Sequence, residues 1–159
     1  LDGEPLGAER EPPGERDRTR DIDAARSIDG VLGAHATDRG PGWLLVRVDR
    51  GWDEPDRAGL GIRVLEQIRS LDLSHPFVVA LGRGVDITDH HTAMFHWVAN
   101  TDFDRDTIRW RPEGAGGVFF DATPKTDGDS RGGHPVRAWP PVLEMDEGVT
   151  ARAIGIRGA

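Results

Sequence analysis

The sequence lacks cysteine altogether and has no long run of apolar residues. Without cysteine, the chain forms no disulfide bond, thiolate metal site or cysteine nucleophile. A membrane-spanning helix needs about 20 consecutive apolar residues, so we expect no membrane segment and no membrane partner. Cations are also scarce, because 20 basic residues face 28 acidic ones and the formal charge is −8. Nucleic-acid-binding proteins need surplus cations to contact phosphates, so this charge argues against a nucleic-acid partner.

Glycine and proline, by contrast, are frequent, and in residues 1–21 they alternate with charged residues. Such a segment buries too little apolar surface to offset the entropy of ordering it. We therefore predict a disordered or arm-like tail, a linker or arm, over residues 1–21 and one domain over residues 22–159. The N-terminus also lacks the basic and apolar regions of a secretory signal, so we expect a cytoplasmic protein.

The middle of the chain alternates strand patterns with helix patterns, which indicates a small layered α/β domain of β-α-β-α-β order. Phe77–Leu81 is continuously apolar, as in a strand that is covered on both faces. One helix is predicted over residues 55–70 with Asp53 as its N-cap, and another from a Thr88 cap to Asn100. After Asp121 we expect an irregular C-terminal extension. Further strands are predicted at 43–48, with Val31 and Leu32 as hairpin partner, and at 107–110 and 118–120. Short apolar pieces follow at 141–143 and 153–156. The buried side of the second helix is predicted to consist of Ala93, Met94, Trp97 and Val98.

Several patterns near the second helix resemble ligand sites but fit them poorly. Two histidines on one helix face ligate a metal at a spacing of four, whereas His90 and His91 lie six and five residues before His96. Gly82-Arg83-Gly84 lies between a strand and a helix, as a phosphate loop would, but lacks the third glycine and the lysine of such loops. No G-x-S-x-G motif is present, and no acidic residue lies in a segment that reads as buried. We predict no catalytic residue and no metal ligand in this chain.

Three polar residues follow the apolar segment at 118–120. They are Asp121, Thr123 and Lys125, the last being the only lysine. Residues just beyond a strand end commonly bind ligands in α/β proteins, which favours a cofactor-binding role. Asp and Thr side chains also satisfy backbone donors in turns, which favours a structural role. Both interpretations stay open at this point.

Four segments follow one another in a distinctive order. An apolar strand precedes D-I-T-D at Asp86–Asp89, and N-T-D-F-D-R-D at Asn100–Asp106 follows the helix. D-A-T-P-K at Asp121–Lys125 and R-A-W-P at Arg137–Pro140 come next. In this order and spacing, residues 25–150 resemble the C-terminal domain of the UbiD family of decarboxylases. Ile28–Val31 and the strand at 43–48 resemble the entry to that domain.

The resemblance implies a role without an active site. In this family the prenylated FMN site, its divalent metal such as manganese and a Glu-Arg-Glu catalytic set lie N-terminal to this domain, and nothing in residues 1–75 resembles them. The resemblance thus implies a UbiD-like oligomerisation domain that holds no cofactor alone, with Asp121, Thr123 and Lys125 as its cofactor-side residues. Departures from the family pattern are Gly82-Arg83-Gly84 in a usually acidic loop, Phe95 where Trp is common, and Pro124 before the lysine.

Three functions are consistent with this sequence. In the first, the chain is a subunit of a prenylated-FMN-dependent (de)carboxylase for an aromatic or α,β-unsaturated acid, and a larger UbiD-like chain supplies the active site in a hetero- or homo-oligomer. In the second, the domain is a stand-alone, non-catalytic assembly or regulatory module. In the third, it is a small flavin- or nucleotide-binding protein that uses the loop at residues 82–84.

Overall fold

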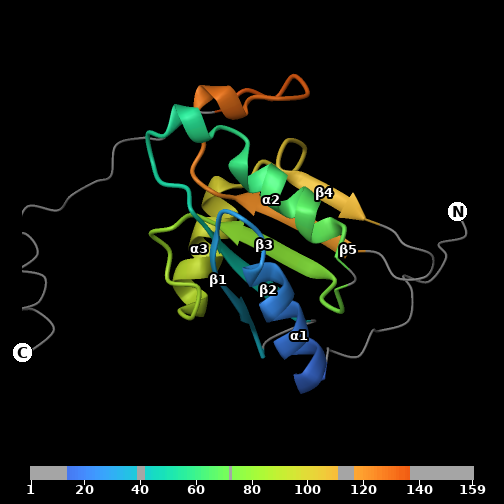
Figure 1. Cartoon of the computed structure of the whole chain (residues 1–159). Helices are drawn as coiled ribbons and strands as arrows, with labels where there is room; N and C mark the ends of the chain where they lie inside the picture. The colour runs from blue at the N-terminus through green and yellow to red at the C-terminus, as the bar shows by residue number, and fades with distance from the viewer. Residues whose placement is uncertain (1–13, 39–41, 72, 111–116, 137–159) are drawn as a thin grey trace, which may run out of the picture.

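The computed structural model describes residues 14–38, 42–71, 73–110 and 117–136. In these residues a five-stranded sheet of order β1-β2-β3-β5-β4 lies between helices (Figure 1). Strands β2, β3 and β5 run parallel, and the edge strands β1 and β4 run antiparallel to their neighbours. The α/β class is therefore confirmed. The strands are β1 Val31–Ala36, β2 Trp43–Val48, β3 Phe77–Leu81, β4 Thr107–Trp110 and β5 Gly117–Ala122.

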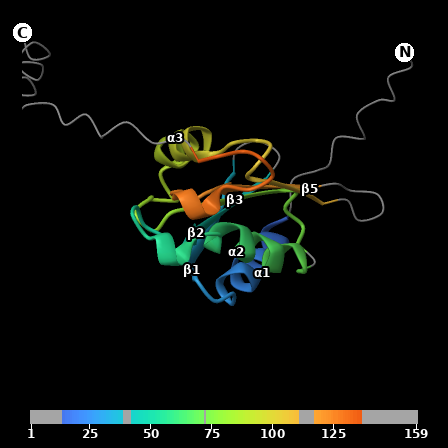
Figure 2. The same cartoon turned by 90° about the horizontal axis from the view of Figure 1, so that it is seen from above.

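The central strand β3 has its side chains buried on both faces of the sheet. Val78 and Ala80 pack into a core cluster with residues of α1 (Glu15–Arg26) and α2 (Leu60–Arg69). Val79 and Leu81 pack into a second cluster with residues of α3 (His90–Asn100). Figure 2 shows the sheet edge-on between α3 and the other two helices. Because alternate side chains enter opposite layers, the continuous apolar run at β3 is explained as predicted.

The predicted helix over residues 55–70 is two helices. A 3-10 turn, η1 at Pro55–Arg57, precedes α2, and Gly59 between them has a left-handed backbone with φ 70°. This conformation interrupts a right-handed helix, and glycine adopts it without steric cost. Asp53 is not the N-cap, since the residue before η1 is Glu54 and makes no side-chain cap.

The second predicted helix is correct in extent but not in its cap or its buried side. The N-cap of α3 is Asp89, whose carboxylate accepts hydrogen bonds from the backbone N–H groups of His91 and Thr92. Thr88 instead donates its hydroxyl proton to Asp86, at 2.7 Å. Ala93 is buried as predicted, whereas Val98 is 66% exposed. The helical spacing predicts Val98 on the side that faces the sheet. That spacing does not determine how α3 is rotated against the sheet, and in the structure Val98 faces outward.

Regular secondary structure begins earlier in the chain than predicted, because α1 starts at Glu15 rather than near Ile22. Residues 15–21 therefore do not belong to a tail. The reason is a tertiary contact. Asp21 in this helix is fully buried, and its carboxylate accepts hydrogen bonds from the backbone N–H groups of Ser74 and His75, just before β3. Charged composition does not reveal such a contact. Residues 1–13 and the predicted pieces at 141–143 and 153–156 lie outside the described residues.

No helix within the described part of the chain has the length and apolar character needed to cross a bilayer.

Candidate functional site

The carboxyl edge of the sheet has the geometry of a ligand site. The loop after β2 leads through η1 to α2 on one face, while the loop after β3 leads to α3 on the opposite face (Figures 1 and 2). Neighbouring parallel strands whose connections diverge in this way leave a crevice at their carboxyl ends, where α/β proteins bind ligands. The edge between β2 and β3 is therefore the candidate functional site.

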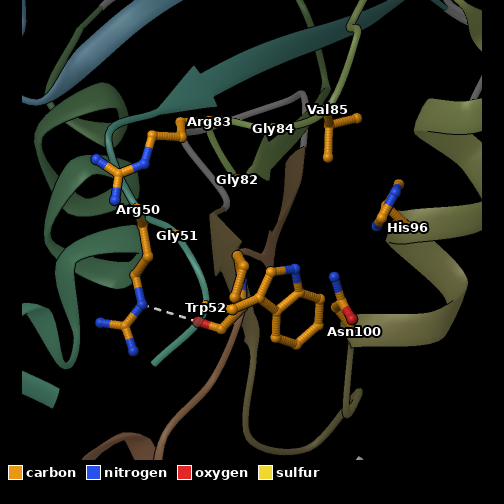
Figure 3. A pocket seen from close by; sticks show the side chains of 10 residues that line it. Arg50, Gly51, Trp52, Gly82, Arg83, Gly84, Val85, His96 and Asn100 are labelled. Carbon is orange, nitrogen blue, oxygen red and sulfur yellow. Dashed lines mark hydrogen bonds between the residues drawn. The ribbon is translucent and has the colours of Figure 1, made fainter. Parts of the chain in front are cut away.

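A cavity of about 290 Å³ occupies this edge (Figure 3). Its volume is near the lower end of small-molecule pockets. Gly82 closes one side of it, and a Cβ at this residue would lie 2.6 Å from Cδ of Pro124. The glycine is thus required by close packing of two loops. The cavity is lined by Arg50, Gly51, Trp52, Gly82, Arg83, Gly84, Val85, His96, Asn100 and Pro124.

Arg50 is fully buried behind the cavity and joins three loops at this edge. Its Nε donates to the carbonyl of Pro124 at 2.8 Å, and its Nη1 donates to the carbonyl of Arg57. Its Nη2 lies 2.6 Å from Asp129, which is almost fully buried as well. Burial raises the pKa of Asp129. The backbone N–H groups of Thr126 and Gly59 and the charge of Arg50 lower it by more, so the net pKa lies below its ordinary value. The sequence carried no signal for this pair.

Arg83 is the exposed cation at the cavity rim, and it is already paired. Its guanidinium donates to Asp49 at 2.8 Å and forms an ion pair with Glu54. Asp49 also pairs with Arg57 at 2.5 Å, and that hydrogen bond holds the pKa of Asp49 below its usual value. The loop at residues 82–84 therefore presents a compensated cation rather than an open phosphate-binding charge.

The structure brings Asp121, Thr123 and Lys125 together in one buried cluster. Asp121 accepts from the Thr123 backbone N–H at 3.0 Å and from its hydroxyl at 2.6 Å. Lys125 Nζ donates to the carbonyls of Asp121 and Thr123, both at 2.8 Å, and lies 3.1 Å from the Asp121 carboxylate. The Lys125 side chain is only 3% exposed.

This cluster satisfies its own polar groups. The three N–H donors of an ammonium group match the three oxygens around Lys125 Nζ, so an anionic cofactor group would have to displace one of them. A cofactor-binding role for the three residues stays a prediction. Because its polar groups are already paired with one another, the cluster as it stands does not fit the phosphate or ring of prenylated FMN.

Replacing Lys125 with Met tests the structural contribution of the cluster. We expect Lys125→Met to lower the free energy of unfolding by about 2–3 kcal/mol, because Asp121 is left as a buried carboxylate without its cation. Arg69→Met is the matched control, since the ion pair of Arg69 with Glu66 is exposed and contributes at most about 1 kcal/mol. Equal stability of both variants in urea titrations would contradict a structural role for Lys125.

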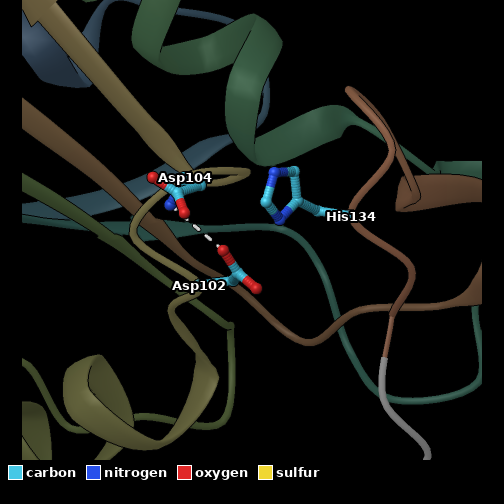
Figure 4. Close-up of side chains that lie close together, drawn as sticks. All are labelled: Asp102, Asp104 and His134. Carbon is cyan, nitrogen blue, oxygen red and sulfur yellow. Dashed lines mark hydrogen bonds between the residues drawn. The ribbon is translucent and has the colours of Figure 1, made fainter.

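The histidines of α3 do not assemble a metal site with other ligands among the described residues. The one group there with converging ligand atoms is Asp102, Asp104 and His134, whose atoms lie within 4.8 Å of one another (Figure 4). Asp102 already accepts from the backbone N–H groups of Asp104 and Arg105, and the latter bond lowers the pKa of Asp102. Because Asp104 is exposed and exposed acidic groups often gather without a cation, we assign no metal here.

A buried pair of hydrogen-bonded side chains that the sequence did not predict, Asp21 and His75, lies at the opposite end of the sheet. Asp21 Oδ2 lies 2.6 Å from His75 Nδ1, and neither side chain is exposed. Burial raises the pKa of Asp21, but hydrogen bonds from His75, Arg20 and the Ser74 backbone N–H lower it more, and the net shift is downward. Asp21 is thus a buried carboxylate in a segment that did not read as buried. The H-P dipeptide before an apolar strand gave no hint of an acidic partner 54 residues away.

No protein-family model matches this sequence, and no curated protein matches it. Solved structures do match its fold. An evolved dimeric form of the UbiD-class enzyme HmfF from Pelotomaculum thermopropionicum, in complex with prFMN, aligns with a TM-score of 0.54 at 14% identity over 79% of this chain and 27% of its own. Vanillic acid decarboxylase ShVdcCD from Sedimentibacter hydroxybenzoicus, in closed form, aligns with a TM-score of 0.57 at 12% identity. That alignment covers 87% of this chain and 30% of the decarboxylase chain.

A third match is 3,4-dihydroxybenzoic acid decarboxylase AroY from Klebsiella pneumoniae, with a TM-score of 0.53 at 15% identity over 86% of this chain and 32% of its own. The chain shares the fold of part of UbiD-class decarboxylases. It spans about a third or less of the length of these enzymes. At such low identity the similarity is one of fold, and it agrees with the resemblance that the ordered sequence motifs indicated.

Proposed function

We propose that this chain is the assembly domain of a UbiD-like (de)carboxylase that acts on an aromatic or α,β-unsaturated carboxylic acid. The observation that carries the proposal is the alignment of 79–89% of the chain with about 30% of several UbiD-class decarboxylases. The order of the D-I-T-D and D-A-T-P-K segments adds support. A larger UbiD-like chain would hold prenylated FMN, a divalent metal such as manganese and the catalytic glutamates and arginine, and this chain would be cytoplasmic.

The outer side of α3 offers a surface for such a partner. Phe95, Val98 and Phe103 are 67%, 66% and 60% exposed, and we call these three residues the α3 patch. Phe95 and Val98 lie on α3, and Phe103, which follows the helix, contacts the partly buried Trp97 and the buried Phe120. Large apolar side chains exposed on one helix, such as Phe95 and Val98, can form part of an interaction surface. The α3 patch therefore supports an assembly role.

Co-purification tests the proposal at native expression levels. We expect a larger chain in fixed stoichiometry, a flavin-like absorbance in the complex, and release of CO2 from an aromatic or unsaturated acid by the complex but not by this chain. A colourless homo-oligomer without a partner would overturn the subunit assignment. That result would favour the second candidate, a stand-alone assembly or regulatory module, which the α3 patch also supports.

Charge introduced into the α3 patch is expected to weaken assembly. Phe95→Asp together with Val98→Asp places two carboxylates in the surface. We expect affinity for the partner to fall at least about tenfold, because burying an unpaired carboxylate in an apolar interface costs more than about 1.4 kcal/mol. Circular dichroism should stay unchanged because both side chains are exposed. Gln67→Asp on α2, an exposed position on the other side of the sheet, is the matched control. Equal affinities of the two variants by titration calorimetry would refute a role of the patch.

A further inference from the structure

We infer that the cavity at the carboxyl edge of β2, β3 and β5 binds a small, uncharged, planar aromatic molecule with a hydrogen-bonding edge. This inference does not depend on the decarboxylase proposal, because it rests on the cavity of this chain alone. A dry apolar cavity of roughly 150 Å³ accommodates benzene, so about 290 Å³ leaves room for a ring and a polar substituent.

The cavity walls favour a flat ring. Trp52 contributes an indole that is 50% exposed, and Val85 and Pro124 are buried apolar residues beside it. The glycines of both loops bring backbone close to the cavity, and a Cβ at Gly84 would meet no atom within 4 Å. Indole faces bind other aromatic rings in offset or edge-to-face geometry. A planar ligand fits such a slot better than a branched aliphatic one.

The charges around the cavity favour a neutral ligand. Its lining contains two arginines and no carboxylate, but each arginine has a carboxylate partner already. Arg50 is directed at Asp129, away from the cavity, and Arg83 is held by Asp49 and Glu54. The cavity therefore offers neither an anion nor a cation an uncompensated charge of the opposite sign. Both are disfavoured relative to an uncharged molecule.

Two polar side chains from α3 supply the hydrogen-bonding edge. His96 and Asn100 lie one helical turn apart and project from α3 toward the loops (Figure 3). One N–H of the buried Asn100 carboxamide donates to the carbonyl of Ala122 at 3.2 Å. The second N–H and the carboxamide oxygen remain for a ligand or water, and an imidazole adds a donor and an acceptor. An amide or a similar donor–acceptor group on the ring matches this pair.

Benzamide and benzoate form a matched pair of probes, since they share the ring and differ in charge. In ¹H–¹⁵N spectra of the full chain, we expect benzamide to shift the signals of the Trp52 indole, Gly84 and the Asn100 side chain saturably, with a millimolar Kd. Benzoate and FMN should bind at least about tenfold more weakly. No saturable shift with benzamide, or binding of benzoate or FMN at equal strength, would overturn the inference.

Variants connect the signal to the cavity. Trp52→Ala should weaken benzamide binding about tenfold, which corresponds to the energy of one aromatic contact. Leu32→Ala, at a comparably exposed apolar residue outside the cavity lining, should leave the Kd unchanged. His96→Leu provides a second variant if Trp52→Ala fails to fold. It should weaken the binding of benzamide, because it removes one hydrogen-bonding partner of the ligand. Unchanged affinity in the folded cavity variants would assign the binding elsewhere.

Discussion

Replacing Arg50 with Met is expected to lower the free energy of unfolding by about 3–5 kcal/mol, the largest loss that we predict for this chain. The guanidinium is fully buried and donates to Pro124, Arg57, Thr126 and Asp129. Its loss leaves the Asp129 carboxylate buried without a cation and two carbonyl oxygens without a donor. Because these bonds join three loops around the cavity, we also expect Arg50→Met to abolish ligand-induced shifts at Gly84.

Two further variants separate the charge effect from simple loss of packing. Arg50→Met combined with Asp129→Asn should recover part of the lost stability, because no uncompensated charge is then buried. Arg63→Met, which removes an exposed arginine with one bond to the carbonyl of Ala58, should cost at most about 1 kcal/mol. A double variant less stable than Arg50→Met in guanidinium titrations would show that buried charge is not the cause.

Replacing Asp21 with Asn is expected to lower the free energy of unfolding by about 3 kcal/mol. The Asp21 carboxylate accepts from the backbone N–H groups of Ser74 and His75 at 2.8 and 3.2 Å and contacts His75 Nδ1 at 2.6 Å. An asparagine at this position presents an NH2 group to some of these donors. Asp23→Asn, an exposed position on the same helix, is the matched control and should leave stability nearly unchanged.

Asp21 also makes the free energy of unfolding depend on pH. The pKa of Asp21 in the folded chain lies below its ordinary value of 3.8. The ionised carboxylate therefore stabilises the fold above about pH 4, and this contribution is lost as the pH falls through the folded-state pKa. Asp129 acts in the same direction. We expect a steep loss of stability below about pH 4 that Asp21→Asn makes shallower, and identical pH profiles of the two proteins would contradict the assignment.

The patterns that depend on neighbouring residues predicted most of the fold. Apolar runs identified β2 to β5 and the extent of α3, because side-chain direction along a strand or helix follows from backbone geometry alone. The first strand was identified only in part, as a hairpin partner at Val31 and Leu32. The split at Gly59 and the exposed Val98 were not predictable in this way. Each depends on how an element is oriented against the sheet, and the local pattern does not contain that orientation.

The candidate site was predictable only in part. The loop at residues 82–84 and the cluster at Asp121, Thr123 and Lys125 were identified because both follow strand ends, where ligands commonly bind. Trp52, His96 and Asn100 were not identified as a group, since the cavity joins residues as far apart in the sequence as Arg50 and Pro124. Arg50 gave no signal among many arginines, because its burial results from three loops that close over it.

By itself, the sequence determined the α/β class, the absence of any thiol chemistry and an order of motifs that resembles one domain of the UbiD family of decarboxylases. These properties follow from composition and local periodicity, which every conformation of the chain shares. Only the tertiary structure decided which charges are buried and compensated, where α1 begins and where a cavity opens. Those features depend on distances between segments far apart in the chain, and such distances exist only once the sheet has formed.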